Sequence, residues 1–226
     1  MTPSVSAVIC VWNGERYLEA ALDSIRAQER PAAEIVVVDD GSTDATPAIA
    51  AAPDVRYVRI EHGGVAAARN RALDEARGEL IAFLDADDRW TAGKLRVQVD
   101  FMLAHPELGS TITHQHLELP PGAARPRWIA PAELEKDGPC FGTASLVAWR
   151  WAFDRVGRFD PTLGIGEDTD WIVRAADLGV GMGVVTETLL NRRVHERNLS
   201  ATRQPAQLEM LKVLRASIAR KRSRNP

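Results

Sequence analysis

The chain has few cysteines, no long apolar run and no strong excess of either charge. Only two of its 226 residues are cysteines, Cys10 and Cys140, which argues against a disulfide framework. No apolar stretch reaches the roughly 18 residues that a membrane-spanning helix needs, and no basic leader precedes the first apolar run, so we expect no signal peptide. The net charge of −3 gives no basis for nucleic-acid binding. These absences favour a cytoplasmic globular domain with a sizeable core.

Two glycine-rich phosphate-binding motifs are also missing. No Gly-x-Gly-x-x-Gly follows the first predicted strand, which argues against a dinucleotide site. No Gly-x-x-x-x-Gly-Lys-Ser/Thr occurs, which excludes a P-loop. A phosphate-receiving signalling domain would carry its acidic pair after the first strand, whereas here the pair Asp39-Asp40 follows the second. A nucleotidyltransferase would have a glycine-rich loop with a basic residue where this chain has Trp12-Asn-Gly-Glu15.

Strand and helix patterns alternate through about the first 100 residues. Short apolar runs bounded by turns predict buried strands, and apolar residues three or four positions apart predict helices. The predicted strands span 5–12, 35–38, 55–60 and 80–84, and predicted helices span 45–52, 65–76 and 95–103. Repeated strand–helix units favour a mostly parallel α/β sheet with right-handed connections.

The pattern changes beyond residue 105. Residues 110–119 alternate only partly, as in an exposed or edge strand, and one or two strands are expected within 180–190. Residues 120–131 contain four prolines and predict a loop of the length that often forms a lid or a specificity element. Residues 207–226 predict an amphipathic helix with six basic and no acidic residues from Lys212 onward. Contact with an anionic membrane surface and a solvated terminus both stay open for it.

Acidic residues gather where the predicted strands end. The apolar run Leu80 to Leu84 leads into Asp85, Asp87 and Asp88, and the second strand leads into Asp39-Asp40. Three carboxylates so close together would repel one another unless a cation lies among them, and Mg²⁺ or Mn²⁺ suits oxygen ligands. The carboxyl ends of parallel strands are also the ligand side of an open sheet. The alternative for Asp88 is a cap on the following helix.

Two later polar segments have both a structural and a functional interpretation. Asp168 lies in the first turn of a predicted helix, where an acidic residue suits the helix dipole. His195 lies in the polar segment 192–200, where it would ligate a metal, contact a phosphate or simply be solvated. The residues alone do not decide between these interpretations.

Taken in order, these motifs resemble family 2 glycosyltransferases of the GT-A fold over roughly residues 4–200. The matching segments are Ala7-Val-Ile-Cys-Val-Trp-Asn-Gly14, Glu34-Ile-Val-Val-Val-Asp-Asp-Gly-Ser-Thr-Asp44, Ala67-Ala-Arg-Asn70, Arg77-Gly-Glu-Leu-Ile-Ala-Phe-Leu-Asp-Ala-Asp-Asp88, Gly157-Arg-Phe-Asp160, Glu167-Asp168 and Arg193-Val-His195. The resemblance implies a Rossmann-like, mostly parallel central sheet flanked by helices, with a smaller mixed region on the acceptor side.

The same resemblance implies a domain organisation. We expect one GT-A domain over 1–204, with a nucleotide-sugar-binding half over 1–105 and an acceptor-side half over 106–204. A basic helix or tail follows over 205–226. The segment 110–140, on the acceptor side, carries no subfamily signature.

The resemblance also assigns roles in binding a sugar-nucleotide donor. Trp12 would pack on the base, commonly uracil, and Asp40 would hydrogen-bond it, with Asp39 beside it. Asp85 would face the ribose, and Asp87 would hold the Mn²⁺ or Mg²⁺ that bridges the diphosphate.

Further residues are implied with less direct roles in the donor site. Val11, Asn13 and Ala86 belong to the same donor-binding segments, and Arg69 and Asn70 are further expected donor contacts.

The expected chemistry is the inverting transfer of a sugar, with UDP-sugars favoured as donors. Asp168 would be the general base, and His195 would lie near the metal or diphosphate. The sugar and the acceptor stay open: a glycan, a lipid-linked glycan, a protein and a small molecule all fit. A non-catalytic module that binds sugar nucleotides or glycans is the alternative function.

Overall fold

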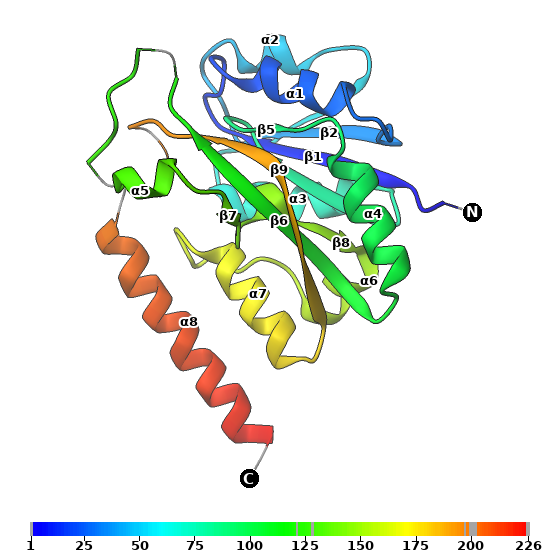
Figure 1. The fold of residues 1–226 in the computed structure, drawn as a ribbon, viewed down its shortest axis with the longest axis vertical. Helices are drawn as coiled ribbons and strands as arrows, with labels where there is room; N and C mark the ends of the chain where they lie inside the picture. The colour runs from blue at the N-terminus through cyan, green and yellow to red at the C-terminus, as the bar shows by residue number, and fades with distance from the viewer. Residues whose placement is uncertain (1, 121, 128, 197, 199–202, 225–226) are drawn as a thin grey trace.

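The computed structural model describes every residue except 1, 121, 128, 197, 199–202 and 225–226 (Figure 1). Pro121 of the predicted loop therefore lies outside the described residues. So do parts of the predicted polar segment 192–200 and the last two residues of the predicted tail.

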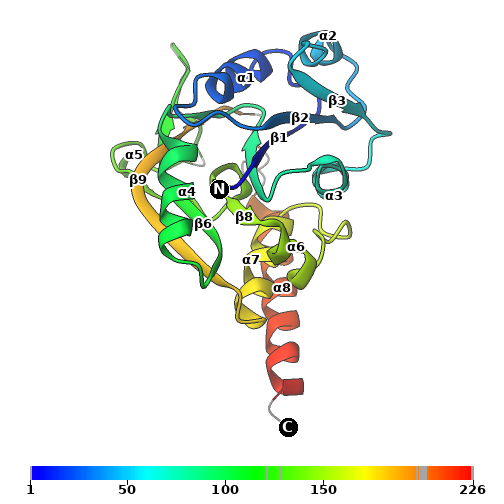
Figure 2. The same cartoon turned by 90° about the vertical axis from the view of Figure 1, so that its right-hand side faces the viewer.

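A mixed β-sheet with helices on both faces forms the body of the protein (Figures 1 and 2). Its strands are β1 (Val5–Val11), β2 (Glu34–Asp39), β3 (Val55–Arg59), β4 (Leu80–Asp85), β5 (Arg89–Trp90), β6 (Leu108–Glu118), β7 (Gly138–Pro139), β8 (Val147–Trp149) and β9 (Gly181–Arg193). The helices are α1 (Leu18–Arg26), α2 (Thr46–Ala50), α3 (Val65–Glu75), α4 (Lys94–Ala104), α5 (Pro131–Leu134), α6 (Arg150–Val156), α7 (Glu167–Asp177) and α8 (Arg203–Arg224), with a 3₁₀ turn at Thr143–Ser145.

The sheet has a parallel half and a mixed half. Its strand order is β3-β2-β1-β4-β8-β6-β9-β5, with β7 paired to β6. The first four of these strands are parallel, β8 runs antiparallel to both β4 and β6, and β6 and β9 are parallel. This arrangement confirms the predicted α/β class. The predicted elements before residue 105 agree with the structure to within about two residues.

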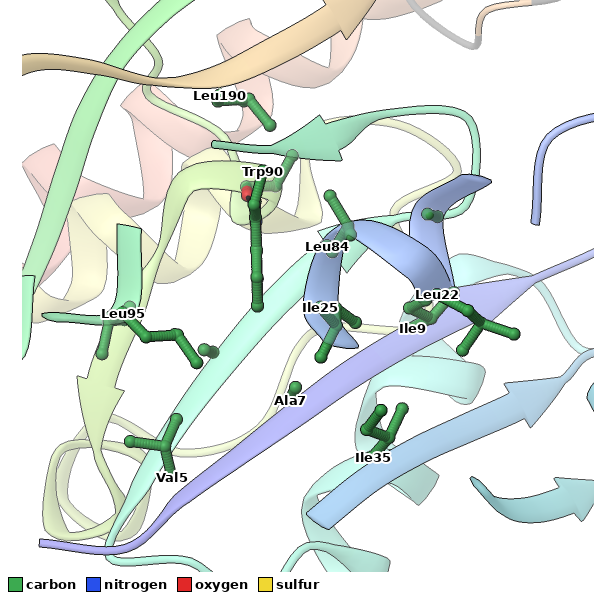
Figure 3. Close-up of a cluster of buried hydrophobic side chains, with 14 of the residues drawn as sticks. Val5, Ala7, Ile9, Leu22, Ile25, Ile35, Leu84, Trp90, Leu95 and Leu190 are labelled. Carbon is green, nitrogen blue, oxygen red and sulfur yellow. Dashed lines mark hydrogen bonds between the residues drawn. The ribbon is translucent and has the colours of Figure 1, made fainter. Parts of the chain in front are cut away.

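The sheet is buried on both faces because its strands alternate apolar side chains between two cores. Ala7 and Ile9 of β1 point into a core that also contains residues of α1 and α4, and Figure 3 shows them with Leu22, Ile25 and Leu95. Val8 points into the opposite core, which is built with α3, α6 and α7. Burial on both sides explains why these strands are continuously apolar in the sequence.

The prediction of an exposed or edge strand at 110–119 was wrong. Strand β6 lies between β8 and β9, and its hydroxyl-bearing residues Ser110, Thr111 and Thr113 are buried. The burial of Thr111 is compensated by Gln98 of α4, whose side-chain amide donates to the Thr111 carbonyl and hydroxyl at 3.2 and 3.1 Å. The strands expected within 180–190 form one long strand, β9.

Helix α4 begins with a lysine that is fully buried. The Nζ of Lys94 lies 4.0 Å from the centroid of the Trp90 ring, and it has no hydrogen-bond partner among the described residues. Burial lowers the pKa of Lys94 well below its ordinary value. The charged form of Lys94 is therefore disfavoured in the folded protein relative to the unfolded chain.

The lowered pKa of Lys94 makes stability depend on pH. Between the lowered pKa of folded Lys94 and the ordinary value of about 10.4, the unfolded chain binds more protons, so stability rises with pH. Lys94→Met should remove up to about 1.4 kcal/mol per pH unit from this slope and stabilise the protein at pH 7. Urea unfolding of both proteins between pH 7 and 9 measures the difference. Arg96→Met, on the exposed side of the same helix, is the control and should leave the slope unchanged. Equal slopes for Lys94→Met and the unmodified protein would contradict a lowered pKa of Lys94.

Candidate functional site

The parallel strands bring the predicted acidic residues to one edge of the sheet. Strand pairing places Val11 beside Asp39 and Cys10 beside Asp85, so β1, β2 and β4 end side by side. Val11 itself is buried, and its carbonyl accepts from the backbone N–H of Asp40 at 2.8 Å. This edge is where parallel sheets of this kind bind ligands.

Trp12 and Asp40 form one end of the site, together with a histidine that sequence reasoning missed. Trp12 is 56% exposed, and its ring stacks on His62 with the centroids 4.7 Å apart. Asp40 is buried, and its carboxylate accepts from the backbone N–H groups of Gly63 and Gly64 at 2.8 and 2.9 Å. The Nδ1 of His62 lies 2.9 Å from the same carboxylate. The exposed aromatic face and the adjacent carboxylate therefore occupy one place, as predicted for a base-binding pair.

Asp39 and Asn13 hold the loop beside that pair. Asp39 is completely buried and accepts from the Ser42 backbone N–H at 2.8 Å and from the Tyr57 hydroxyl at 2.6 Å. Burial and the neighbouring Asp39 carboxylate raise the pKa of Tyr57 to about 12. Asn13 has a positive φ of 51°, and its side-chain oxygen accepts from the Thr43 N–H at 2.8 Å. These contacts give both residues a structural role.

The second end of the site is built around Asp87. The Nε2 of His195 and the side-chain amide of Asn198 each lie 3.0 Å from Asp87 Oδ2, although Asp87 is more than 100 residues before both in sequence. The His195 ring stacks on Tyr17, and the guanidinium of Arg193 lies 4.4 Å from the Tyr17 ring centroid. Sequence reasoning missed Tyr17 and Asn198, since neither residue lies in a carboxylate motif.

Asp87 and His195 are a fitting, incomplete set of ligands for a divalent cation. Within the described residues, no three His, Cys, Asp or Glu side chains are grouped so as to hold a metal ion. Mg²⁺ in particular is usually held by one or two carboxylates together with substrate phosphates rather than by an all-protein cage. A carboxylate and an imidazole at the edge of the sheet fit that type of site. The side chain of Ala86 lies between the two aspartates in sequence and contributes no ligand atom.

Asp88 does not cap the following helix, contrary to one interpretation of the sequence. Helix α4 starts at Lys94, and the side chain of Asp88 instead accepts from the backbone N–H of Arg193 at 2.9 Å. Asp88 is buried, and burial together with the nearby Asp87 carboxylate raises its pKa well above the ordinary value. Arg192, another residue without a predicted role, opposes that shift through its charge. The side chain of Asp88 therefore links the segment after β4 to the last residue of β9.

A buried arginine connects the aspartate motif to the second half of the chain. Arg69 is 5% exposed and forms an ion pair with Glu167 at the start of α7, while its other nitrogen lies 3.2 Å from Asp85 Oδ1. Burial alone would lower the pKa of Arg69, but the two carboxylates outweigh it, so the guanidinium stays charged. The predicted donor contact Asn70 lies on the same helix, where its side chain bonds to both backbone groups of Phe159.

Asp168 is brought to this edge by the start of α7. Its Oδ1 accepts from the Thr169 backbone N–H at 2.6 Å. The adjacent Glu167 pairs with Arg69, which also contacts Asp85, so Asp168 reaches this edge although it lies far from both residues in sequence. A Cβ atom added at Gly142 would lie 3.4 Å from Asp168 Oδ2, so that glycine lets the 141–142 loop approach the carboxylate. The adjacent Phe141 is 57% exposed.

Residues 6–145 match the family model described as glycosyl transferase family 2. The chain belongs to this family. It is 31% identical over 224 residues to the succinoglycan biosynthesis protein ExoO of Rhizobium meliloti, a match that covers 89% of this chain and 63% of ExoO. The matches to EpsH and TuaG of Bacillus subtilis cover only 27% and 42% of those proteins. The family 2 chain therefore spans part of the length of each of these relatives.

Solved structures with the GT-A fold resemble this family 2 chain over nearly its whole length. The S. aureus TarS fragment 1–349 in complex with UDP-GlcNAc has a TM-score of 0.76 and 20% identity, covering 96% of this chain and 66% of that one. A mannosyltransferase from Pyrobaculum calidifontis, in complex with GDP-Man and Mn²⁺, has a TM-score of 0.74 and 24% identity, covering 97% and 65%. At these identities the likeness establishes the fold.

The Arg69 ion network should be a main support of the site. Arg69→Met would leave the buried Glu167 carboxylate without its cation, at a cost of about 3–5 kcal/mol of unfolding free energy. In Arg69→Met/Glu167→Leu both buried charges are gone, so its loss should be smaller than the sum of the two single losses. Chemical unfolding of the four proteins measures this coupling. Additive losses would show that the two residues do not depend on each other.

Proposed function

We propose that the chain is a metal-dependent glycosyltransferase that moves a sugar from a UDP-sugar to an acceptor hydroxyl with inversion. The observation that carries this proposal is that Asp168 of helix α7 comes to the sheet edge where β4 ends in Asp85, with Asp87 two residues further on. Glu167, the neighbour of Asp168, pairs with the same Arg69 that contacts Asp85. Membership of glycosyl transferase family 2 supports the reaction class.

The donor's base and diphosphate would bind at opposite ends of the site. The exposed Trp12 ring supplies a stacking surface, and the Asp40 carboxylate supplies a hydrogen-bond acceptor for a base N–H. Donor binding would require His62 to share or leave the Trp12 face. The TarS structure is a complex with UDP-GlcNAc and the mannosyltransferase structure is a complex with GDP-Man, which supports a nucleotide-sugar donor. The resemblance of Trp12 and Asp40 to the family's base-binding residues favours UDP, because the base that those residues bind is commonly uracil.

Asp87 and His195 would hold Mn²⁺ or Mg²⁺ between them and the donor phosphates. When bound, the cation neutralises the charge that develops on the diphosphate leaving group. The guanidinium of Arg192 adds fixed positive charge, because it acts on Asp85, Asp87 and Asp88. The Asn198 side-chain oxygen accepts from the backbone N–H of His195 at 2.6 Å, and the Tyr17 ring stacks on the imidazole, so both residues would keep His195 beside Asp87.

Asp168 would act as the general base. An acceptor hydroxyl oxygen forms a bond to the anomeric carbon while the bond from that carbon to the diphosphate oxygen breaks, and the hydroxyl proton passes to the Asp168 carboxylate. Attack on the face opposite the leaving group inverts the anomeric configuration. Exposed Phe141, next to the glycine that contacts Asp168, gives the acceptor an aromatic surface to pack against. This arrangement suits a ring-shaped acceptor such as a sugar.

Removal of the base should slow turnover without weakening donor binding. Asp168→Asn keeps the size of the side chain, so we expect UDP release from UDP-sugars to fall about 10²–10⁴-fold. Calorimetry should give an unchanged donor Kd, which separates loss of chemistry from loss of folding. Full activity in this variant would rule out the base assignment. Donor binding with no turnover by the unmodified protein across an acceptor panel would favour a non-catalytic binding module.

Removal of the metal ligand should abolish dependence on the cation. Asp87→Ala should lower UDP release at saturating Mn²⁺ by at least about 100-fold, because cation stabilisation supplies several kcal/mol. EDTA should inhibit the unmodified protein and have no further effect on the variant. Asp44→Ala removes an aspartate from the neighbouring loop and should keep a normal response to EDTA. Activity that survives both EDTA and Asp87→Ala would exclude the metal role.

A further inference from the structure

Helix α8 lies against the body along one side only. It packs on α7 and extends beyond the rest of the molecule (Figures 1 and 2). Val213 and Ser217, four residues apart, are buried at 2% and 7% exposure. Within residues 210–222, whose side chains the structure describes, those on the opposite side of the helix are exposed. The helix therefore has a defined inner face and a defined outer face.

The last residue of α7 fixes the rotation of α8. Asp177 accepts from the Ser217 hydroxyl at 2.9 Å and from Arg220 Nε at 2.8 Å, and its side chain is 2% exposed. Burial alone would raise the pKa of Asp177, but the hydrogen bonds from Arg220 and Ser217 outweigh it and lower the pKa. The pair holds one side of α8 against the body, so the same residues always face outward.

The outer face combines aliphatic and cationic side chains. Leu211, Leu214 and Ile218 are 50%, 48% and 52% exposed, and their spacing of three and four residues puts them in one stripe. Arg215 and Arg222 are exposed and lie four residues after Leu211 and Ile218, on the same side. A surface that binds this face must therefore offer both apolar contact and negative charge.

Charge is also distributed unevenly between the end of α8 and the rest of the chain. From Lys212 onward there are six basic residues and no acidic one, out of 28 basic and 31 acidic residues in total. The remainder thus has 22 basic against 31 acidic residues. An anionic surface would attract α8 and repel the body, which orients the molecule with the outer face of α8 toward that surface.

We propose that the outer face of α8 docks on an anionic lipid surface. Phospholipid head groups supply the negative charge, and the acyl boundary accepts Leu211, Leu214 and Ile218. A second copy presenting the same face would set cations against cations. A soluble acidic partner would match the charge and leave the aliphatic stripe in water. Of these occupants, the lipid surface is the one that satisfies both features.

Sedimentation of the full chain with vesicles tests the proposal. The protein should bind vesicles of phosphatidylcholine with about 30% phosphatidylserine, should not bind pure phosphatidylcholine, and should be released in 1 M salt. Arg215→Gln/Arg222→Gln should weaken binding about 30-fold. Leu211→Ser/Leu214→Ser/Ile218→Ser should weaken it at least tenfold at unchanged charge. Arg77→Gln/Arg96→Gln removes the same charge from exposed positions on the body and should bind normally.

The variants are chosen so that folding does not decide the outcome. All the altered side chains on α8 are exposed, and unchanged thermal unfolding would confirm that the body is intact. Equal binding to neutral vesicles, or unchanged binding of the Arg215→Gln/Arg222→Gln variant, would overturn the proposal. Light scattering that shows a dimer, lost in the α8 variants, together with no vesicle binding, would instead assign the face to a second copy.

Discussion

The site depends on a single buried cation, the guanidinium of Arg69. A charge at 5% exposure is tolerated only because Glu167 and Asp85 surround it, and they come from opposite halves of the chain. Satisfying Arg69 therefore fixes the start of α7 against the end of β4. Asp168, the next residue after Glu167, is carried to the sheet edge by the same constraint. An ion network in the interior thus sets the distance between the donor side and the proposed base.

The carboxylates at this edge differ in how many hydrogen bonds they already accept from the rest of the protein. Asp39 accepts from a backbone N–H and a tyrosine hydroxyl, and Asp88 accepts from the Arg193 backbone, so both mainly hold loops in place. Asp40 is largely used by the glycine N–H groups that it accepts from. Asp85 and Asp87 keep more of their surface, with side chains 44% and 29% exposed. These hydrogen bonds therefore separate the carboxylates that hold loops, Asp39 and Asp88, from Asp85 and Asp87, which stay accessible to a ligand.

Sequence reasoning predicted what is encoded locally and missed what depends on distant partners. The parallel half of the sheet was predictable because burial on both faces makes each strand continuously apolar, and the aspartates at the strand ends follow from it. The burial of strand β6 was missed because its serine and threonine residues are polar in the sequence, and no local pattern reveals the hydrogen bonds from Gln98 to Thr111. Asn198 and Tyr17 were missed for the same reason. Their contacts to Asp87 and His195 are made by folding, across separations that sequence spacing does not express.

Helix α7 joins the two features proposed for the second half of the chain. Its first turn carries Asp168, and its last residue, Asp177, holds α8. Asp168 and Asp177 are nine residues apart on the helix, which corresponds to about 14 Å of rigid backbone. A surface that fixed the outer face of α8 would therefore also fix the direction from which an acceptor reaches Asp168. For a sugar acceptor held at that same surface, docking would reduce the search for the site from three dimensions to two, with no change in the chemistry at the sheet edge.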